Sequence, residues 1–214
     1  MHWLIRLLKC IGNGSILRHR SRSIAVKHYA QNCTLRFNGY IEDQMHGSAA
    51  QIRMGCSPLA TLLQKAHAAS FQPGYNACGW VAIYNALLTL GHPAHPAEIV
   101  RCLEQNCFLN VDGLFGTDPR CFAEAFQKLG FRAQTYLSFE PSQLDMQLRA
   151  APTGILCVIN RGGIKNGAHN ICLSWDTVSG VYRMHNACYS GAFGSLDDFL
   201  QRSGTRFLSL TVVK

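Results

Sequence analysis

Residues 72–90 read QPGYNACGWVAIYNALLTL, and this stretch decides how the chain is expected to fold. The part up to Ala77 has the proline, glycine and asparagine that are typical of a turn. From Cys78 to Leu90 the apolar residues recur at the spacing of a helix, and Gly91 follows as a stop signal. The stretch therefore predicts a turn that leads directly into a helix, with Cys78 in the first helical turn.

Helices and strands are segregated along the rest of the chain. Further helices are expected over 58–69, 96–107 and 118–129. After Gly130 the pattern changes to loose alternation and short apolar runs, which predict extended structure. The extended segments are 131–139, 154–160, 168–175, 181–185 and 207–213. Helices followed by an antiparallel sheet indicate an α+β fold with an N-terminal helical half.

Composition divides the 214 residues into two regions. Hydrophobic residues make up 48% and charged residues 15%, which is enough apolar material for a sizeable core. Seven of the 20 basic residues precede Glu42, and no acidic residue does, so most of the net charge of +8 lies there. We interpret 1–55 as a basic, irregular N-terminal segment and 56–214 as one folded domain.

The distribution of charge also argues against nucleic-acid binding and against a secretory signal. A nucleic-acid-binding domain carries its basic patch on the folded body, whereas 56–214 is close to neutral, so we expect no nucleic-acid partner. In the segment 1–55 the basic residues follow a short apolar stretch, which is the wrong order for a secretory signal. Two interpretations remain for this segment: an irregular tail, or a weak amphipathic contact with an anionic membrane surface.

Ten cysteines raise the question of metal sites and disulfides. The sequence has no Cys-x-x-Cys pair, and Cys102 and Cys107 have no matching partners, so we expect no structural zinc site. No cofactor is expected either. Cys157 and Cys172 lie in apolar runs and are expected to be small buried side chains. Without a secretory signal, a reducing cytoplasm with free thiols is the expected location.

One of these cysteines has the position of a nucleophile. The N-terminus of a helix carries partial positive charge and unpaired N–H groups, which stabilise a thiolate. Cys78 is therefore expected to have a lowered pKa. The same N–H groups can bind the oxyanion that forms when a thiolate attacks a carbonyl.

Four other residues complete a candidate catalytic site. Gln72, six residues before Cys78, has a side-chain amide that could donate to the oxyanion. Gly79 would allow a substrate backbone to approach closely. His169 opens an expected strand and Asn186 ends the next one, so a hairpin would bring them together. We interpret His169 as the general base and Asn186 as the acceptor that orients its ring.

These residues resemble a known family. The segment 72–79 with its following helix is similar to the start of papain-like cysteine peptidases, and most closely to the double-glycine leader peptidases that mature bacteriocins. That family pairs a Gln with a Cys six residues later, as Gln72 and Cys78 do. Residues 125–131, AFQKLGF, echo its A-x-x-L-G-F element, and 167–169 match its Gly-x-His strand. The resemblance covers about residues 70–214.

The resemblance implies a papain-like α+β fold, peptide-bond hydrolysis through a thioester, no metal and a peptide or protein substrate. Leader peptidases usually carry Asp where Asn186 stands, although other papain-like enzymes have Asn there. They are also usually fused to a membrane exporter, of which this sequence shows nothing. The superfamily is therefore better supported than the substrate.

Two other function classes stay open at this stage. An acyltransferase or amidase would use the same residues, because only the group that resolves the thioester differs. A non-catalytic peptide-binding module would have the fold alone. Such modules usually lose the nucleophile, whereas this sequence retains Cys78, His169, Asn186 and Gln72.

Overall fold

The structure is a computed structural model, and it describes residues 78–106, 108, 116–161, 167–187 and 192–214. The N-terminal segment 1–55, the expected helix 58–69 and the turn that holds Gln72 lie outside the described residues. The boundary between the two regions of the chain is therefore still a prediction.

The described part of the chain has an α+β fold, as the sequence predicts. Five strands form one sheet in the order β1-β5-β2-β3-β4, and every neighbouring pair is antiparallel. The helices are α4 (Cys78–Thr89), α5 (Pro96–Gln105), α6 (Phe122–Lys128), α7 (Pro141–Arg149) and α8 (Leu196–Ser203). The strands are β1 (Ala133–Tyr136), β2 (Thr153–Ile159), β3 (Ala168–Asp176), β4 (Val181–His185) and β5 (Arg206–Val213).

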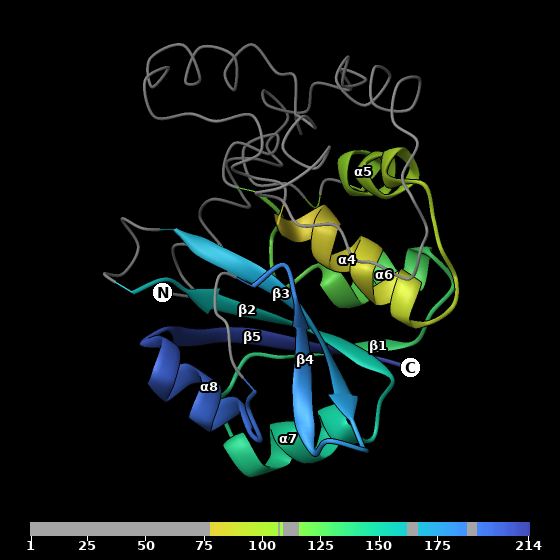
Figure 1. The fold of residues 1–214 in the computed structure, drawn as a ribbon. Helices are drawn as coiled ribbons and strands as arrows, with labels where there is room; N and C mark the ends of the chain where they lie inside the picture. Colours follow the sequence, from red (N-terminus) through yellow and green to blue (C-terminus); the bar gives the residue numbers. More distant parts are fainter. Residues whose placement is uncertain (1–77, 107, 109–115, 162–166, 188–191) are drawn as a thin grey trace.

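The sheet lies between two layers of helices. Figure 1 shows α4, α5 and α6 on one side of the sheet and α7 and α8 on the other. Every residue of β2 is buried, because this strand is central and packs against helices on both faces. An unbroken apolar run is typical of such a strand, and this explains why the alternating pattern of a half-exposed strand is absent from β2.

Each helical layer has its own apolar core. Trp80, Ile83 and Leu87 of α4 pack with residues of α5 and α6 and with Ile155 of β2. On the opposite face, Leu156 of β2 packs with residues of α7 and α8. The ten residues from Cys78 to Leu87 are all buried. The N-terminus of α4 is consequently held at a fixed place against the sheet.

Helix α6 begins four residues later than the sequence predicts. Asp118 was expected to open this helix, but it forms a turn instead. Its Oδ1 accepts a hydrogen bond from the backbone N of Arg120 at 2.9 Å, and its Oδ2 pairs with Arg120 Nη2 at 2.8 Å. An aspartate that binds the backbone two residues ahead favours a turn over a helix. The carboxylate is buried, with 1% of its surface exposed.

Two helices, α7 and α8, were not predicted. Helix α7 is mostly polar and buries only Leu144 and Leu148, so its apolar stripe is narrow. Helix α8 has clearer end signals. Ser195 caps its first turn by accepting a hydrogen bond from the backbone N of Asp198, and Gly204 ends it with a φ of 67°. They cover the face of the sheet opposite α4, so the helices are not confined to an N-terminal half.

His185, the last residue of β4, gives the fold a testable pH dependence. Burial first, and the nearby charge of Arg183 second, lower the pKa of this imidazole from 6.5 to about 4. Between these two values the unfolded chain binds a proton that the folded protein does not. The free energy of unfolding is therefore expected to fall as the pH drops from 6.5 to 4, by about 1.4 kcal/mol per pH unit at most.

Urea unfolding at pH 7 and at pH 4.5 measures this loss, and His185→Gln removes the titrating group. The variant should lose less stability between the two pH values than the wild type loses. An equal loss in both proteins would assign the pH dependence to other groups.

No helix in the described ranges has the length and apolar character required to cross a membrane.

Candidate active site

Cys78 lies at the N-terminus of α4, where the sequence analysis expected it. The helix begins at this residue, and its first turn packs against the sheet next to β3. Figure 1 shows this end of α4 above the first half of β3. Only 6% of Cys78 is exposed. A thiol at this place is close to the positive end of the helix dipole.

The surroundings of Cys78 favour its ionised form. Burial is the largest single influence and by itself would raise the pKa of the thiol. The hydrogen bond and the charge of His169 lower this pKa. The backbone and side-chain amides of Asn170 add to this effect, and the pKa of Cys78 lies below its ordinary value of 9.0. Asn170 Nδ2 donates to Cys78 Sγ at 3.3 Å. The thiol is thus prepared to act as a nucleophile.

His169 is the second residue of β3, and its ring is held by a backbone carbonyl. Its Nε2 makes a short hydrogen bond with the backbone oxygen of Asn186. Since a carbonyl oxygen can only accept, Nε2 must carry a proton. Nδ1 is then the ring nitrogen that can accept the proton of Cys78. The imidazole is buried, with 7% of its surface exposed.

The pairing of β3 and β4 explains how Asn186 reaches His169. The two strands are antiparallel, with Cys172 opposite His185, so the residue after His185 lies beside the first half of β3. The sequence predicts this hairpin. The acceptor for the imidazole, however, is the backbone oxygen of Asn186 and not its side chain. The side chain of Asn186 points to β3 instead, where Nδ2 makes a long contact of 3.5 Å with the backbone oxygen of Asn170.

Asn186 also has an unusual backbone. Its φ is 63°, and it is the one non-glycine residue with positive φ in the described part of the chain. Asparagine tolerates this left-handed conformation better than most other residues. In this conformation the carbonyl oxygen of Asn186 forms its hydrogen bond with His169 Nε2. This observation gives a backbone reason for an asparagine at this place.

Substitution of Asn186 therefore has a specific expected result. Asn186→Gly keeps the carbonyl and accepts the positive φ, so it should lower turnover only slightly. The loss of His169 should lower turnover by about 10²–10⁴-fold, the range of general acid–base catalysis. Asn186→Ala keeps the carbonyl but adds strain of about 1–2 kcal/mol. Peptide turnover and urea unfolding of both variants test this. A glycine variant as inactive as His169→Ala would show that the side chain is essential.

The other cysteines with shifted pKa values behave in the opposite way. Burial raises the pKa of Cys102, and it raises that of Cys172 to about 12. The pKa of Cys157 is raised well above its ordinary value by burial, and then by the negative charges of Cys78 and Asp118. Cys157 and Cys172 are 1% and 0% exposed, as their apolar runs predicted. They are suited to packing and not to nucleophilic attack.

Gly79 has a different role from the one expected. It is buried, and a Cβ at this position would overlap the side chain of Thr117. The space beside Gly79 is thus filled by the protein itself and is not open to a substrate backbone. The glycine lets the segment before α6 pack closely against the first turn of α4.

Gln72, the expected oxyanion donor, lies outside the described residues. The structure brings Cys78, His169 and Asn186 together and adds Asn170, which the sequence analysis did not identify. Its position directly after His169 was a weak signal, because neighbours in a strand usually point to opposite faces. The pairing of β2 and β3 is more informative about the side to which Asn170 points. Asn170 lies opposite Cys157 of β2, so the two side chains share one face of the sheet.

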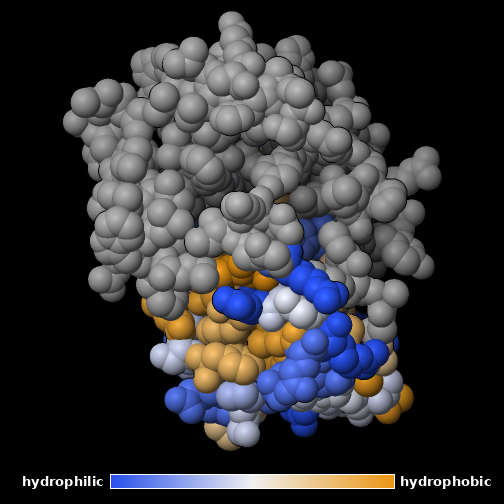
Figure 2. Space-filling model, turned by 90° about the vertical axis from the view of Figure 1, so that its left-hand side faces the viewer, coloured by the Kyte–Doolittle hydropathy of each residue, from blue (hydrophilic) through white to orange (hydrophobic). Residues whose placement is uncertain are grey.

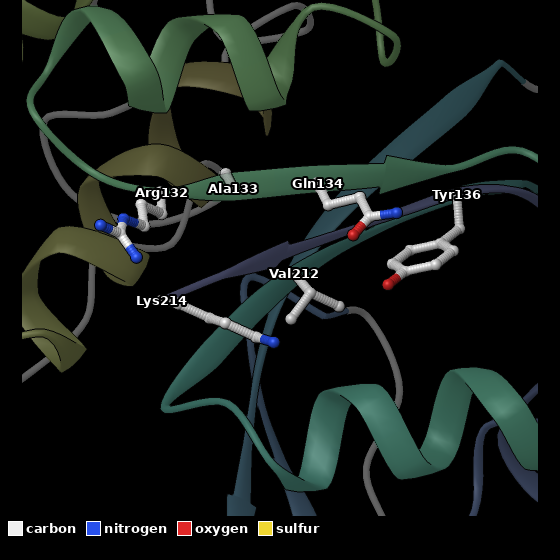
Figure 3. A pocket seen from close by; sticks show the side chains of 6 residues that line it. All are labelled: Arg132, Ala133, Gln134, Tyr136, Val212 and Lys214. Atoms are coloured by element: carbon white, nitrogen blue, oxygen red, sulfur yellow. The ribbon is translucent and has the colours of Figure 1, made fainter.

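A hollow of about 150 Å³ lies elsewhere in the described structure, and Figure 3 shows the side chains around it. It is lined by residues of β1 and β5 and by those next to them: Arg132, Ala133, Gln134, Tyr136, Val212 and Lys214. β1 is at the opposite edge of the sheet from β4. The hollow is smaller than a typical ligand site of about 300–1,000 Å³, so it does not compete with the site at Cys78.

The surface on the side of the molecule where β2 ends and β3 begins has both hydrophobic and hydrophilic residues. Figure 2 views the molecule from this side and shows hydrophobic residues that adjoin hydrophilic ones in its described part. Within the described ranges, His, Cys, Asp and Glu side chains form no group of three or more that could hold a metal ion.

Comparison of the chain with protein-family models finds no match, and comparison with curated proteins finds none either. Its function must therefore be argued from the site itself.

Proposed function

We propose that this protein is a cysteine peptidase with a papain-like fold, in which Cys78 is the nucleophile and His169 the general base. The observation that carries the proposal is the arrangement at the start of α4. A thiol with a lowered pKa, an imidazole that hydrogen-bonds it, and a carbonyl that fixes the imidazole tautomer lie in one chain of contacts. A nucleophile, a base and an orienting group are the three roles of a catalytic triad.

The first half of the reaction would form a thioester. The Cys78 proton moves to His169 Nδ1, and the thiolate attacks the carbonyl carbon of the scissile peptide bond. The oxygen becomes an oxyanion, which the Cys78 backbone N–H and the Gln72 amide would hold. As the C–N bond breaks, its electron pair goes to the leaving nitrogen, which takes the proton from His169.

The second half would release the acyl group. Water attacks the thioester carbon and gives one proton to His169. The C–S bond breaks, and its electron pair returns to Cys78 Sγ. The products are a carboxylic acid, which then releases its proton to solvent as the carboxylate, and the regenerated thiolate–imidazolium pair. The Asn186 carbonyl keeps the ring aligned in both halves, because its hydrogen bond with Nε2 is the same in each.

The proposal extends to fold and substrate class. The α+β architecture, with α4 packed against an antiparallel sheet that carries His169, supports a papain-like fold. The resemblance to leader peptidases supports a peptide substrate, with a leader-bearing peptide as the first to test. We propose a reducing, cytoplasmic location, because Cys78, Cys102, Cys157 and Cys172 are free thiols and not disulfide-bonded.

The test is hydrolysis of a library of unstructured peptides, some of which carry a Gly-Gly pair before the cleavage site. Mass spectrometry would locate the new termini. Wild-type protein should cleave a subset, and Cys78→Ala, prepared identically, should cleave none. Equal cleavage by both proteins would indicate a contaminating peptidase, and a folded wild type that cleaves no peptide would oppose the proposal.

An acyltransferase would form the same thioester as a peptidase, so a separate experiment is needed to distinguish the two. Adding a primary amine to the cleavage assay offers a second acceptor for the acyl group. Hydrolysis predicts free carboxylate as the main product. A main product with an amide bond to the added amine would assign the protein to the acyltransferases.

A further inference from the structure

We propose that Asn170 is an additional functional residue of this site, whose side-chain amide holds the Cys78 sulfur in its ionised form. The expected effect of Asn170 on turnover rests on the proposed function, whereas its expected effect on the ionisation of the thiol does not. Asn170 lies on β3 directly after His169 and is 4% exposed. Its Nδ2 donates to Cys78 Sγ at 3.3 Å.

The orientation of the Asn170 amide matches a thiolate. An amide has a donor end and an acceptor end, and a thiolate can only accept. In the structure the donor end faces the sulfur, whereas Oδ1 is buried and has no hydrogen-bond partner among the described residues. A buried polar atom without a partner is costly and rare in native proteins. The contact with Cys78 supplies a functional reason for tolerating it.

Asn170 is held in place by the sheet around it. Its strand pairs with β2, where Cys157 lies opposite Asn170. The side chain of Asn186 approaches its backbone oxygen at 3.5 Å. Asn186 thus contacts both residues that bind the thiol: its carbonyl contacts His169, and its amide contacts Asn170.

The contribution of Asn170 differs in kind from that of His169. The imidazole stabilises the thiolate as a charged partner, so its effect changes when it loses its proton. The amide is neutral and donates at every pH. It should also favour the second half of the reaction, in which the C–S bond breaks and the electron pair returns to Sγ, because a stabilised thiolate is a better leaving group.

The test is the pH dependence of Cys78 alkylation by iodoacetamide, mapped by mass spectrometry. Asn170→Leu keeps the approximate size of the side chain and removes the donor. A hydrogen bond to a charged group suggests that the midpoint of alkylation will rise by about 1–2 pH units. Cys172→Ala, on the same strand and two residues away, is the matched control and should leave the midpoint unchanged.

Among the described residues, the other titratable groups that act on the sulfur or on its neighbour Cys157 are His169 on β3, Cys157 on β2 and Asp118. All of them remain in the variants, so a shift is assigned to the amide. Asn170→Asp serves as a second variant if Asn170→Leu does not fold. It is nearly isosteric, and its carboxylate should raise the midpoint further by repulsion. An unchanged or lowered midpoint in a folded variant overturns the inference.

The turnover profile separates this role from a structural one. In the peptidase, the acidic limb of kcat/KM should move upward with the alkylation midpoint in Asn170→Leu, whereas a loss of packing alone would lower turnover at all pH values equally. If the midpoint shifts but wild-type protein cleaves no peptide, the proposed function fails and this inference stands. If wild-type protein cleaves peptides and the midpoint does not move, this inference alone fails.

Discussion

His169→Ala should lower peptide turnover by about 10²–10⁴-fold, the range that general acid–base catalysis contributes. Labelling of Cys78 by iodoacetamide at pH 7 should fall with it. The reason is that His169 supplies both a hydrogen bond and a charge to the thiolate, while burial acts in the opposite direction. Steady-state turnover and the rate of labelling, measured on one preparation, test the two losses together.

His185→Gln is the matched control for this variant. It removes a second imidazole, which is only partly buried, from the end of the adjacent strand β4. It should leave Cys78 labelling near the wild-type rate. A His169→Ala variant that retains normal turnover, or a His185→Gln variant that loses as much, would contradict the assignment of His169 as the base.

Gln72→Ala should separate turnover from thiol reactivity. Removing one oxyanion donor typically lowers turnover by about 10²–10³-fold, or about 2.7–4 kcal/mol of transition-state stabilisation. An oxyanion donor does not ionise the thiol, so Cys78 should still react with iodoacetamide at the wild-type rate. This pattern differs from that of His169→Ala, in which both quantities fall.

Melting temperature controls for folding in this experiment, and Gln72→Glu is the matched variant, because it keeps the size of the side chain but removes the N–H donor. Near-normal turnover of Gln72→Ala would reject the oxyanion assignment. Loss of labelling as well as turnover would give Gln72 a structural role in the segment before α4.

Much of the fold could be predicted because its elements have strong local signals. The apolar run of β2 and the apolar repeat of α4 each fixed an element to within about a residue. Helix α7 was missed because its two buried leucines make a weak pattern. Helix α6 begins late because the side chain of Asp118 competes for the backbone, which periodicity cannot reveal.

The candidate site could likewise be predicted only in part. Cys78 and His169 could be identified from their positions at a helix start and a strand start. The hydrogen bond from His169 to a backbone carbonyl could not be predicted, because a sequence pattern does not reveal which backbone carbonyl will lie next to an imidazole. Asn170 depends on the packing of α4 against β3, a tertiary relation that no local pattern encodes. For Gly79 the expectation of room for a substrate backbone was wrong, because the side chain of Thr117 fills that space.

The central claim is that Cys78 is the reactive nucleophile among the ten cysteines of the chain. The most direct measurement is treatment of the native protein with a limiting amount of iodoacetamide near pH 7, followed by mapping of the label on every cysteine. We predict that Cys78 is labelled well before the others and that peptide turnover is lost in proportion to its labelling. Labelling of other cysteines at the same rate as Cys78, or full labelling of Cys78 with turnover retained, would contradict the account.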